Sequence, residues 1–186
     1  MNNSKNNFIK VFLNLKSIRM LFLGFSSGLP ILLVFSTLSV WLVKAEVDRN
    51  TITMFSWAAL AYSFKFIWSP IIDNFKLPFQ KFGHRKSWLL ISQIMIVLSL
   101  IFISFTDPSK TLTLTAIGSL LIAFSSASQD IVIDAYRIES APQRLQGVLS
   151  SLYIAGYRIA MLVAGAGSLL LASHLGLEVY NVEVWK

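Results

Sequence analysis

The sequence contains no cysteine, and only 13% of its 186 residues are charged. Without cysteine, the chain has neither disulfide bridges nor thiolate metal ligands. A soluble domain normally carries about 25% charged residues, whereas this chain is 55% hydrophobic and has long runs without charge. This composition predicts an all-α integral membrane protein.

The motifs of soluble chemistry are also missing. The sequence has no glycine-rich phosphate loop, no zinc-ligand spacing and no serine elbow. Its two histidines, His84 and His174, fall in connections that we expect on opposite sides of the membrane. We therefore predict no enzyme activity, no catalytic residue, no metal site and no cofactor.

Five apolar runs are long enough to cross a bilayer, since about 20 helical residues span its hydrocarbon core of about 30 Å. They cover residues 19–43, 51–72, 88–105, 112–133 and 147–173. We predict a transmembrane bundle over residues 19–173. It is preceded by a cytoplasmic tail over residues 1–18, which is either a short interfacial helix or frayed, and followed by an external segment over residues 174–186.

The net charge of +7 does not indicate a nucleic-acid partner, because the basic residues lie mostly in the short connections, where they orient the helices. Ten of them are expected on one side of the membrane: Lys5, Lys10, Lys16, Arg19, Lys76, Lys81, Arg85, Lys86, Arg137 and Arg144. Four are expected on the other: Lys44, Arg49, Lys110 and Lys186. The positive-inside rule then predicts a cytoplasmic N-terminus and an external C-terminus.

Small residues recur at helical spacing in two of the runs. Gly24 and Gly28 precede Pro30, a kink site, in the first run. In the fifth run, small residues recur every fourth position: Gly156, Ala160, Ala164 and Ser168. Such faces let helices approach closely. Plain bundle packing is the favoured interpretation, and the bending of a rocking transporter remains the alternative.

Ionisable residues within the runs are costly in a membrane and need a partner, a wet cavity or a function. Lys65 is expected about 12 Å from the end of its span, and Asp130 lies one turn deeper than Asp134. A Lys65–Asp130 pair is therefore geometrically allowed. Asp130 is either a proton-coupling site or one member of a fixed ion pair. Arg158, near the expected midplane, suggests a cavity for an anionic ligand.

Other polar residues near the expected ends of the spans have simpler interpretations. Asp134 and Asp73 lie close to the interface, where charged side chains reach water. We predict that Asp134 pairs with Arg85, Lys86 or Arg137 and acts as a latch. Tyr62, Tyr153 and Tyr157 lie deeper, and either line a cavity or pack against neighbours.

Four stretches resemble the muropeptide permease (AmpG) family of the major facilitator superfamily. They are "GFSSGLP" (24–30), "YSFKFIWSPIID" (62–73), "SASQDIVIDA" (126–135) and "GYRIAML" (156–162). The segment from Ser69 to Lys86 is similar to the loop between helices two and three of that superfamily. Ser69 stands in place of its first glycine, Asn74 at its basic position, and seven additional residues separate Asp73 from Gly83. The Gln129–Asp134 segment also resembles the acetyl-coenzyme A transporters.

The resemblance implies a bacterial inner-membrane transporter that carries anhydro-muropeptides into the cytoplasm with protons. The fold it implies is an incomplete major-facilitator bundle, because such transporters combine two six-helix halves. The expected partners are a muropeptide-like solute, protons, the lipid bilayer and a complementary C-terminal transporter chain. Two alternatives remain: a non-transporting truncated remnant, and a transporter of another large anion such as an acyl-coenzyme A.

These considerations give three groups of candidate site residues. Asp130 and Lys65 are the proton-coupling candidates. The candidate substrate-binding residues are Arg158, Tyr157, Tyr62 and Gln129. The candidate gating residues are Asp134, Asp73, Arg85 and Lys86.

Overall fold

The computed structural model describes residues 12, 14–77, 83–175 and 180–185, and all regular structure in these residues is helical. The first rod comprises α2 (Leu15–Leu32), the π-helical turn η1 (Leu33–Thr37) and α3 (Leu38–Lys44). Next come α4 (Arg49–Phe55), η2 (Ser56–Ala58), α5 (Ala59–Ser63), η3 (Lys65–Ile67) and α6 (Ser69–Asn74). They are followed by α7 (His84–Ser104), α8 (Leu112–Ser140), α9 (Gln143–Leu162), the π-helical η5 (Val163–Gly167), α10 (Ser168–His174) and α11 (Val182–Trp185).

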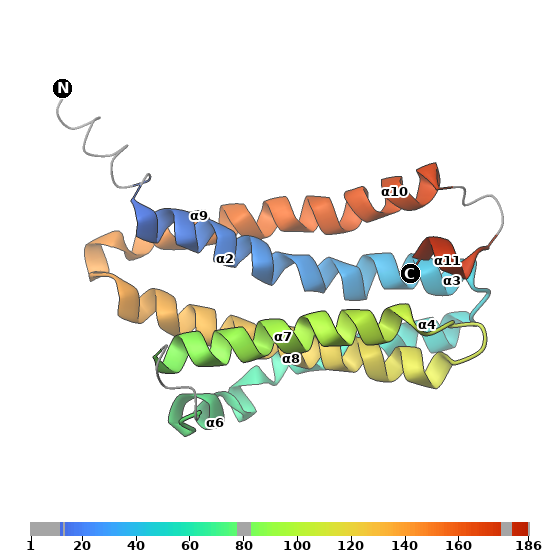
Figure 1. The fold of residues 1–186 in the computed structure, drawn as a ribbon, viewed down its shortest axis with the longest axis horizontal. Helices are drawn as coiled ribbons and strands as arrows, with labels where there is room; N and C mark the ends of the chain where they lie inside the picture. Colours follow the sequence, from blue (N-terminus) through green and yellow to red (C-terminus); the bar gives the residue numbers. More distant parts are fainter. Residues whose placement is uncertain (1–11, 13, 78–82, 176–179, 186) are drawn as a thin grey trace.

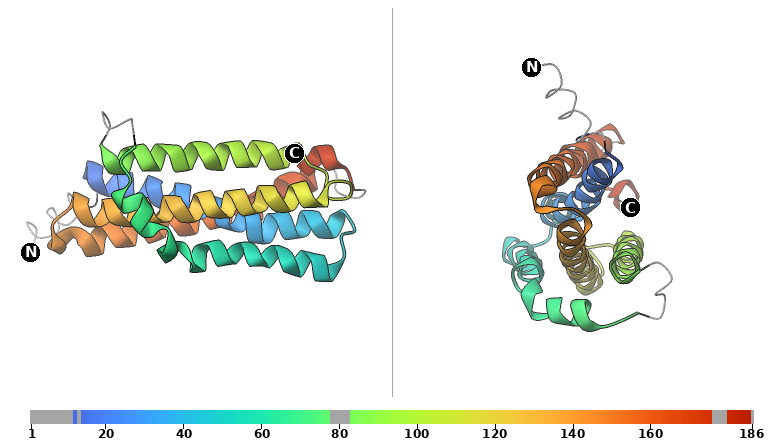
Figure 2. Two further views of the ribbon diagram at one scale, coloured as in Figure 1. Left: turned by 90° about the horizontal axis from the view of Figure 1, so that it is seen from below. Right: turned by 90° about the vertical axis from the view of Figure 1, so that its left-hand side faces the viewer.

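Four helical rods of the described residues are long and apolar enough to cross a membrane. They cover Leu15–Lys44, His84–Ser104, Leu112–Ser140 and Gln143–His174. The rods run side by side along one direction (Figures 1 and 2). The chain is therefore an all-α membrane protein, as its composition predicts. Each rod extends past the predicted span at one end or at both, although the rod of α7 stops at Ser104, one residue before the predicted end. The positions of the bilayer boundaries stay predictions.

The second predicted span, residues 51–72, differs from the expected single helix because it is divided into short helical pieces. The backbone leaves the α-helical ladder at Phe64 (φ −96°, ψ 10°) and at Trp68 (φ −102°, ψ −2°). Pro70 follows in the first turn of α6, where its missing amide costs no hydrogen bond. Lys65 consequently lies on a 3₁₀ turn beside a break rather than within a regular helix.

Helix α8 occupies the centre of the bundle. In its most apolar stretch 72% of the residues are buried, against 22–33% in the other three rods. It packs along α7 and also contacts α2, α5 and α6. The end-on view of Figure 2 shows α8 between α7 on one side and the broken second segment on the other. Polar groups on α8 are thus shielded from the surroundings by the neighbouring helices.

Helices α2 and α9 pack with their backbones in close contact. A Cβ atom at Gly24 would lie 2.0 Å from the carbonyl oxygen of Tyr153, and one at Gly156 would lie 2.0 Å from that of Leu21. Ala160 and Ala164 on the same face of the last rod are buried as well. The packing role predicted for both small-residue faces is confirmed.

The same two rods each contain a π-helical turn, and the two turns lie side by side. The turn in the first rod starts three residues after Pro30, at the kink site that the sequence predicts. The Thr37 hydroxyl donates to the carbonyl oxygen of Ala164 at 3.0 Å and lies 2.8 Å from the Ser168 hydroxyl. A hydrogen-bonded contact therefore joins the irregular regions of both helices.

Residues at the two ends of the chain are only partly described. The interfacial helix predicted within residues 1–18 falls mainly on residues 1–11 and 13, outside the described part. The predicted external segment is described over 174–175 and 180–185, where Trp185 of α11 stacks on Trp41 of α3. The start of α2 and the helix α11 lie at opposite ends of the bundle (Figure 1).

Candidate functional site: a buried polar face on the central helix

The central helix presents a continuous polar face in its second half. Ser125, Ser126, Ser128 and Gln129 are all buried there, and Asp130 follows directly. Residues four apart on a helix share a face, so Ser126, Asp130 and Asp134 form one row along α8. This row extends from the middle of the bundle toward the end at which α2 begins.

Asp130 is hydrogen-bonded to α2 and is linked through that contact to α9. The Ser27 hydroxyl of α2 donates a hydrogen bond to the Asp130 carboxylate. The same hydroxyl lies 3.0 Å from the Tyr153 hydroxyl of α9. Asp130 therefore belongs to a chain of hydroxyl groups that connects the first, fourth and fifth predicted spans.

Gln129 is fully buried and forms a second polar contact with α2. Its Nε2 donates to the Ser26 hydroxyl at 3.1 Å, and Gln93 of α7 donates to the same hydroxyl at 3.4 Å. The Gln129 Oε1 atom has no hydrogen-bond partner within the described part of the chain. A buried acceptor without a partner is costly, so this oxygen is an unsatisfied polar atom inside the bundle.

Aromatic hydroxyl groups surround the deeper part of this face. The Tyr62 hydroxyl of α5 is buried near Ser126, but the two groups lie outside normal hydrogen-bond geometry. Tyr153 and Tyr157 of α9 lie with ring centroids 6.1 Å apart, and Tyr157 is partly buried. The three tyrosines considered in the sequence thus lie near Asp130.

The cation predicted beside Asp130 pairs elsewhere. The Lys65 Nζ atom lies 3.9 Å from Asp134, and Arg137 lies 3.3 Å from the other oxygen of Asp134. No salt bridge joins Lys65 to Asp130 within the described residues. The geometrically allowed Lys65–Asp130 pair is therefore not formed, because the 3₁₀ turn directs Lys65 toward the end of α8. The Asp134–Arg137 pair, one of three that we predicted, is confirmed.

Arg158 stands apart from the polar face. Its side chain is exposed, and its guanidinium lies 3.9 Å from the sulfur of Met161 on the same helix. In the described residues it lies within 4.0 Å of no carboxylate. The small face of α9 packs on α2, so the neighbouring position 158 is turned outward. The structure does not bring Arg158 together with Asp130.

Two candidate gating residues meet at the end of the bundle. Arg85, in the first turn of α7, lies 2.5 Å from Asp73 of α6 and 2.7 Å from Glu139 of α8. This ion-pair cluster ties three helices together. Asp134 is not part of it, and Lys86 is exposed beside it without a salt bridge in the described residues.

Several residues of the site were not assigned roles from the sequence. Ser26 and Ser27 lie within the "GFSSGLP" stretch, but a serine carries no local signal that it faces a carboxylate on a distant helix. Glu139 and Gln93 were likewise missed. A pair of adjacent serines between Gly24 and Gly28, at the depth expected for Asp130, was the signal that could have indicated Ser27.

Comparison with known proteins places the chain among transporter sequences. Residues 16–174 match the family described as Acetyl-coenzyme A transporter 1. The chain is 43% identical over 168 residues to "Putative transporter AmpG 4" of Rickettsia felis, which covers 90% of the chain and 41% of that protein. It is 40% identical over 165 residues to "Anhydromuropeptide permease" of Escherichia coli K12, which covers 89% of the chain and 33% of the permease.

The chain spans about a third to two fifths of the length of these curated relatives. All four stretches quoted from the sequence lie inside the matched residues 16–174. The resemblance to the muropeptide permeases that the sequence predicts is confirmed.

Proposed function

Because the chain belongs to the Acetyl-coenzyme A transporter 1 family, we propose that it forms one wall of the solute pathway of a membrane transporter. The relatives named above are described as a transporter and a permease, which points away from an enzyme. The observation that carries the proposal is the buried polar face of α8, where a carboxylate, an amide and several hydroxyl groups meet at the contacts with α2, α5 and α9. Polar groups inside a membrane bundle generally mark a pathway for solutes or ions.

The solute that we propose is an anhydro-muropeptide, carried toward the cytoplasm across a bacterial inner membrane. The 40% identity to an anhydromuropeptide permease supports this cargo. Such a solute has many hydroxyl and amide groups, which the half-buried Tyr157 suits. The unsatisfied Gln129 Oε1 atom and Tyr62 hydroxyl would join it once a movement of the helices exposes them. The exposed Arg158 is available to an anionic group of the solute, or to a partner chain that completes the pathway.

We further propose that Asp130 is the group that binds the coupling proton. Its hydrogen bond from Ser27, in contact with Tyr153, gives it two states: a carboxylate that accepts from Ser27, and a carboxylic acid that releases this hydroxyl. Proton binding thus neutralises Asp130 and weakens a contact between α2 and α8. Lys65 and Asp134, with the Arg85–Asp73 pair, then act at the end of the pathway as gating groups.

A chimera tests the proposal. Residues 14–175 replace the matched segment of the Escherichia coli permease, and uptake of labelled anhydro-muropeptide is measured in cells without their own permease. We expect saturable uptake that a protonophore abolishes. In the chimera, Asp130→Asn should abolish accumulation but leave solute exchange, whereas Asp134→Asn should slow uptake several-fold and keep its dependence on protons.

The control is Asp48→Asn, since Asp48 is an exposed cap of α4 whose capping bond asparagine preserves. If Asp130→Asn accumulates solute like this control, Asp130 is not the proton site. A correctly inserted chimera without uptake would favour a non-transporting remnant. Uptake of acetyl-coenzyme A in place of the muropeptide would favour the second cargo, which the name of the matched family suggests.

A further inference from the structure

A cavity lies between α2, α7 and α8. It has a volume of about 370 Å³ and is lined by Arg19, Phe22, Leu23, Ser26, Arg85, Lys86, Leu89, Gln93, Val132 and Tyr136. This volume is in the range of small-molecule sites, about 300–1,000 Å³. Ser26 and Gln93, which belong to the hydrogen-bond network of Gln129, close its inner end, and the gating candidates Arg85 and Lys86 also line it. Asp130, Gln129, Tyr62 and Tyr157 do not line it, so the proposed solute pathway does not account for its apolar walls and basic mouth.

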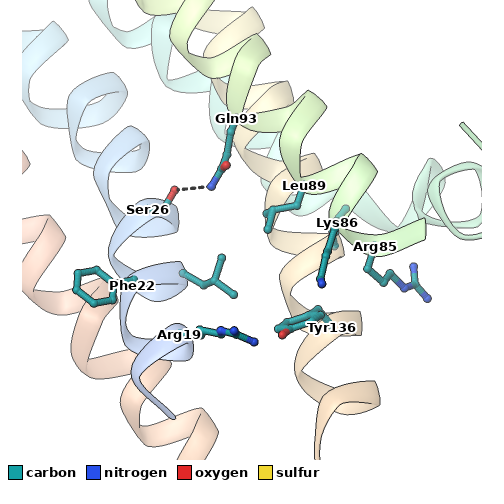
Figure 3. A pocket seen from close by; sticks show the side chains of 10 residues that line it. Arg19, Phe22, Ser26, Arg85, Lys86, Leu89, Gln93 and Tyr136 are labelled. Carbon is teal, nitrogen blue, oxygen red and sulfur yellow. Dashed lines mark hydrogen bonds between the residues drawn. The ribbon is translucent and has the colours of Figure 1, made fainter. Parts of the chain in front are cut away.

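The cavity is polar at its mouth and apolar along its walls. Arg19, Lys86 and Tyr136 approach one another at the mouth from three different helices (Figure 3). Leu23, Leu89 and Val132 form the walls. The hydrogen bond from Gln93 to Ser26, 3.4 Å long, closes the inner end. The cavity therefore suits a molecule with a polar head and an apolar tail.

The charge at the mouth is positive. Arg85 is directed away from the cavity in Figure 3, and its guanidinium is neutralised by Asp73 and Glu139. Arg19 and Lys86 are exposed, and within the described residues neither lies within salt-bridge distance of a carboxylate. The mouth also lies at the N-terminus of α7, where the helix dipole favours an anion.

We propose that this cavity binds one anionic phospholipid of the surrounding leaflet. Arg19 and Lys86 contact the phosphate, Tyr136 donates to the headgroup, and an acyl chain lies along Leu23 and Leu89. Basic pockets between helices on the cytoplasmic side of a membrane bind anionic headgroups in this way, and this end carries the predicted cytoplasmic excess of positive charge. A bound lipid would fill the gap between α2 and α7 and hold the two helices at a fixed separation.

The test uses the purified full chain in detergent and titrates phosphatidylglycerol and phosphatidylcholine, with bound lipids counted by native mass spectrometry. We expect one phosphatidylglycerol to bind at least tenfold more tightly than phosphatidylcholine. The double variant Arg19→Gln/Lys86→Gln should lower the phosphatidylglycerol affinity about tenfold and leave that for phosphatidylcholine unchanged. The reason is that each of the two cations contributes a similar share of the attraction to an anionic headgroup.

The matched control is Lys76→Gln/Arg144→Gln, which removes two exposed cations at the same end of the bundle but outside the cavity. It should change the phosphatidylglycerol affinity less than twofold. Equal losses in both double variants would mean general surface attraction and would overturn the proposal. Displacement of the lipid by millimolar glycerol phosphate would identify a phosphate site instead. A dimer that dissociates in the Arg19→Gln/Lys86→Gln variant would identify a second copy of the chain as the occupant.

Discussion

Lys65 forms its salt bridge with Asp134 and not with Asp130, and the strength of this pair limits what it can do. Both side chains are partly exposed, at 36% and 45%, and their charged atoms are 3.9 Å apart. A pair of this kind contributes at most about 1 kcal/mol. It is therefore strong enough to shift the balance between two conformations but too weak to hold the bundle together.

A double-mutant cycle distinguishes the two carboxylates. The melting temperatures of Lys65→Met, Asp134→Asn and Asp130→Asn, singly and in pairs, are measured in detergent. The unfolding free-energy changes obtained from these temperatures should be non-additive by up to about 1 kcal/mol for Lys65→Met with Asp134→Asn. Those for Lys65→Met with Asp130→Asn should add within error. Strong coupling of Lys65 to Asp130 would contradict the observed geometry and restore the fixed ion pair as an interpretation.

Asp107, in the connection between α7 and α8, gives a pH dependence outside the spans. A hydrogen bond from the Ser109 hydroxyl, 2.6 Å long, and a further one from Tyr180 hold the pKa of the Asp107 carboxyl below its ordinary value. Because the folded pKa is the lower one, these contacts stabilise the fold at neutral pH. The stabilisation starts to fade below about pH 4, near the unfolded pKa, and is lost as the pH falls through the folded pKa.

The consequence is a pH-dependent release of the segment that carries Tyr180 and Trp185. Trp185 stacks on Trp41 with ring centroids 6.3 Å apart, so tryptophan fluorescence should change as Asp107 is protonated. The Asp107→Asn variant should lack this change in acid, and Trp185→Phe should lack most of its amplitude. The transition should persist in Asp48→Asn. A transition that is unchanged in Asp107→Asn would assign the effect to another carboxyl.

At the scale of the elements, the contact of α2 with α9 is the tightest constraint in the fold. Glycine at positions 24 and 156 lets each helix touch the backbone carbonyl oxygen of the other, which a Cβ atom would prevent. A larger residue must therefore separate the helices and disturb the Ser27–Tyr153 contact beside Asp130. Packing and the candidate site are coupled through this one interface.

We expect Gly24→Ala and Gly156→Ala each to destabilise the folded chain by about 2–3 kcal/mol, as overpacked positions do. The measurement is the melting temperature in detergent, together with the yield of monodisperse protein. Gly147→Ala is the matched control, because nothing lies within 4 Å of a Cβ atom at that position of α9. It should be neutral or slightly stabilising, since alanine favours a helix. A similar loss at all three positions would show that the close approach is unimportant.

For the whole molecule, the excess of basic residues in the connections at one end predicts that this end faces the cytoplasm. The positions 76 and 109 are both exposed and lie in connections at opposite ends of the bundle. The native chain has no cysteine, so Lys76→Cys and Ser109→Cys each introduce a single label site. In intact cells, an impermeant maleimide should label position 109 and leave position 76 unlabelled until the cells are opened. The reverse pattern would invert the predicted orientation.

The long helices and their small-residue faces were predictable, because hydropathy and four-residue spacing are properties of local sequence. The break at Phe64 and Trp68 was not, since aromatic residues are accepted within helices and Pro70 was the one local signal. The partners of charged groups were predicted least well. Whether Lys65 reaches Asp130 or Asp134 depends on the rotation of one 3₁₀ turn, and the pairing of Arg85 with Glu139 depends on how α7 and α8 are placed.

The paired π-helical turns have a consequence for sequence length. A π-helical turn contains one residue more than the α-helical turn it replaces, as the bond from the Leu38 amide to the Leu33 carbonyl shows. Deleting one residue from 33–37 should therefore regularise the helix and leave α3 in register with its neighbours. The same deletion within residues 15–29 would rotate everything beyond it by about 100°. Homologous chains can thus differ by one residue at this place, and alignments should set a gap there rather than a mismatch.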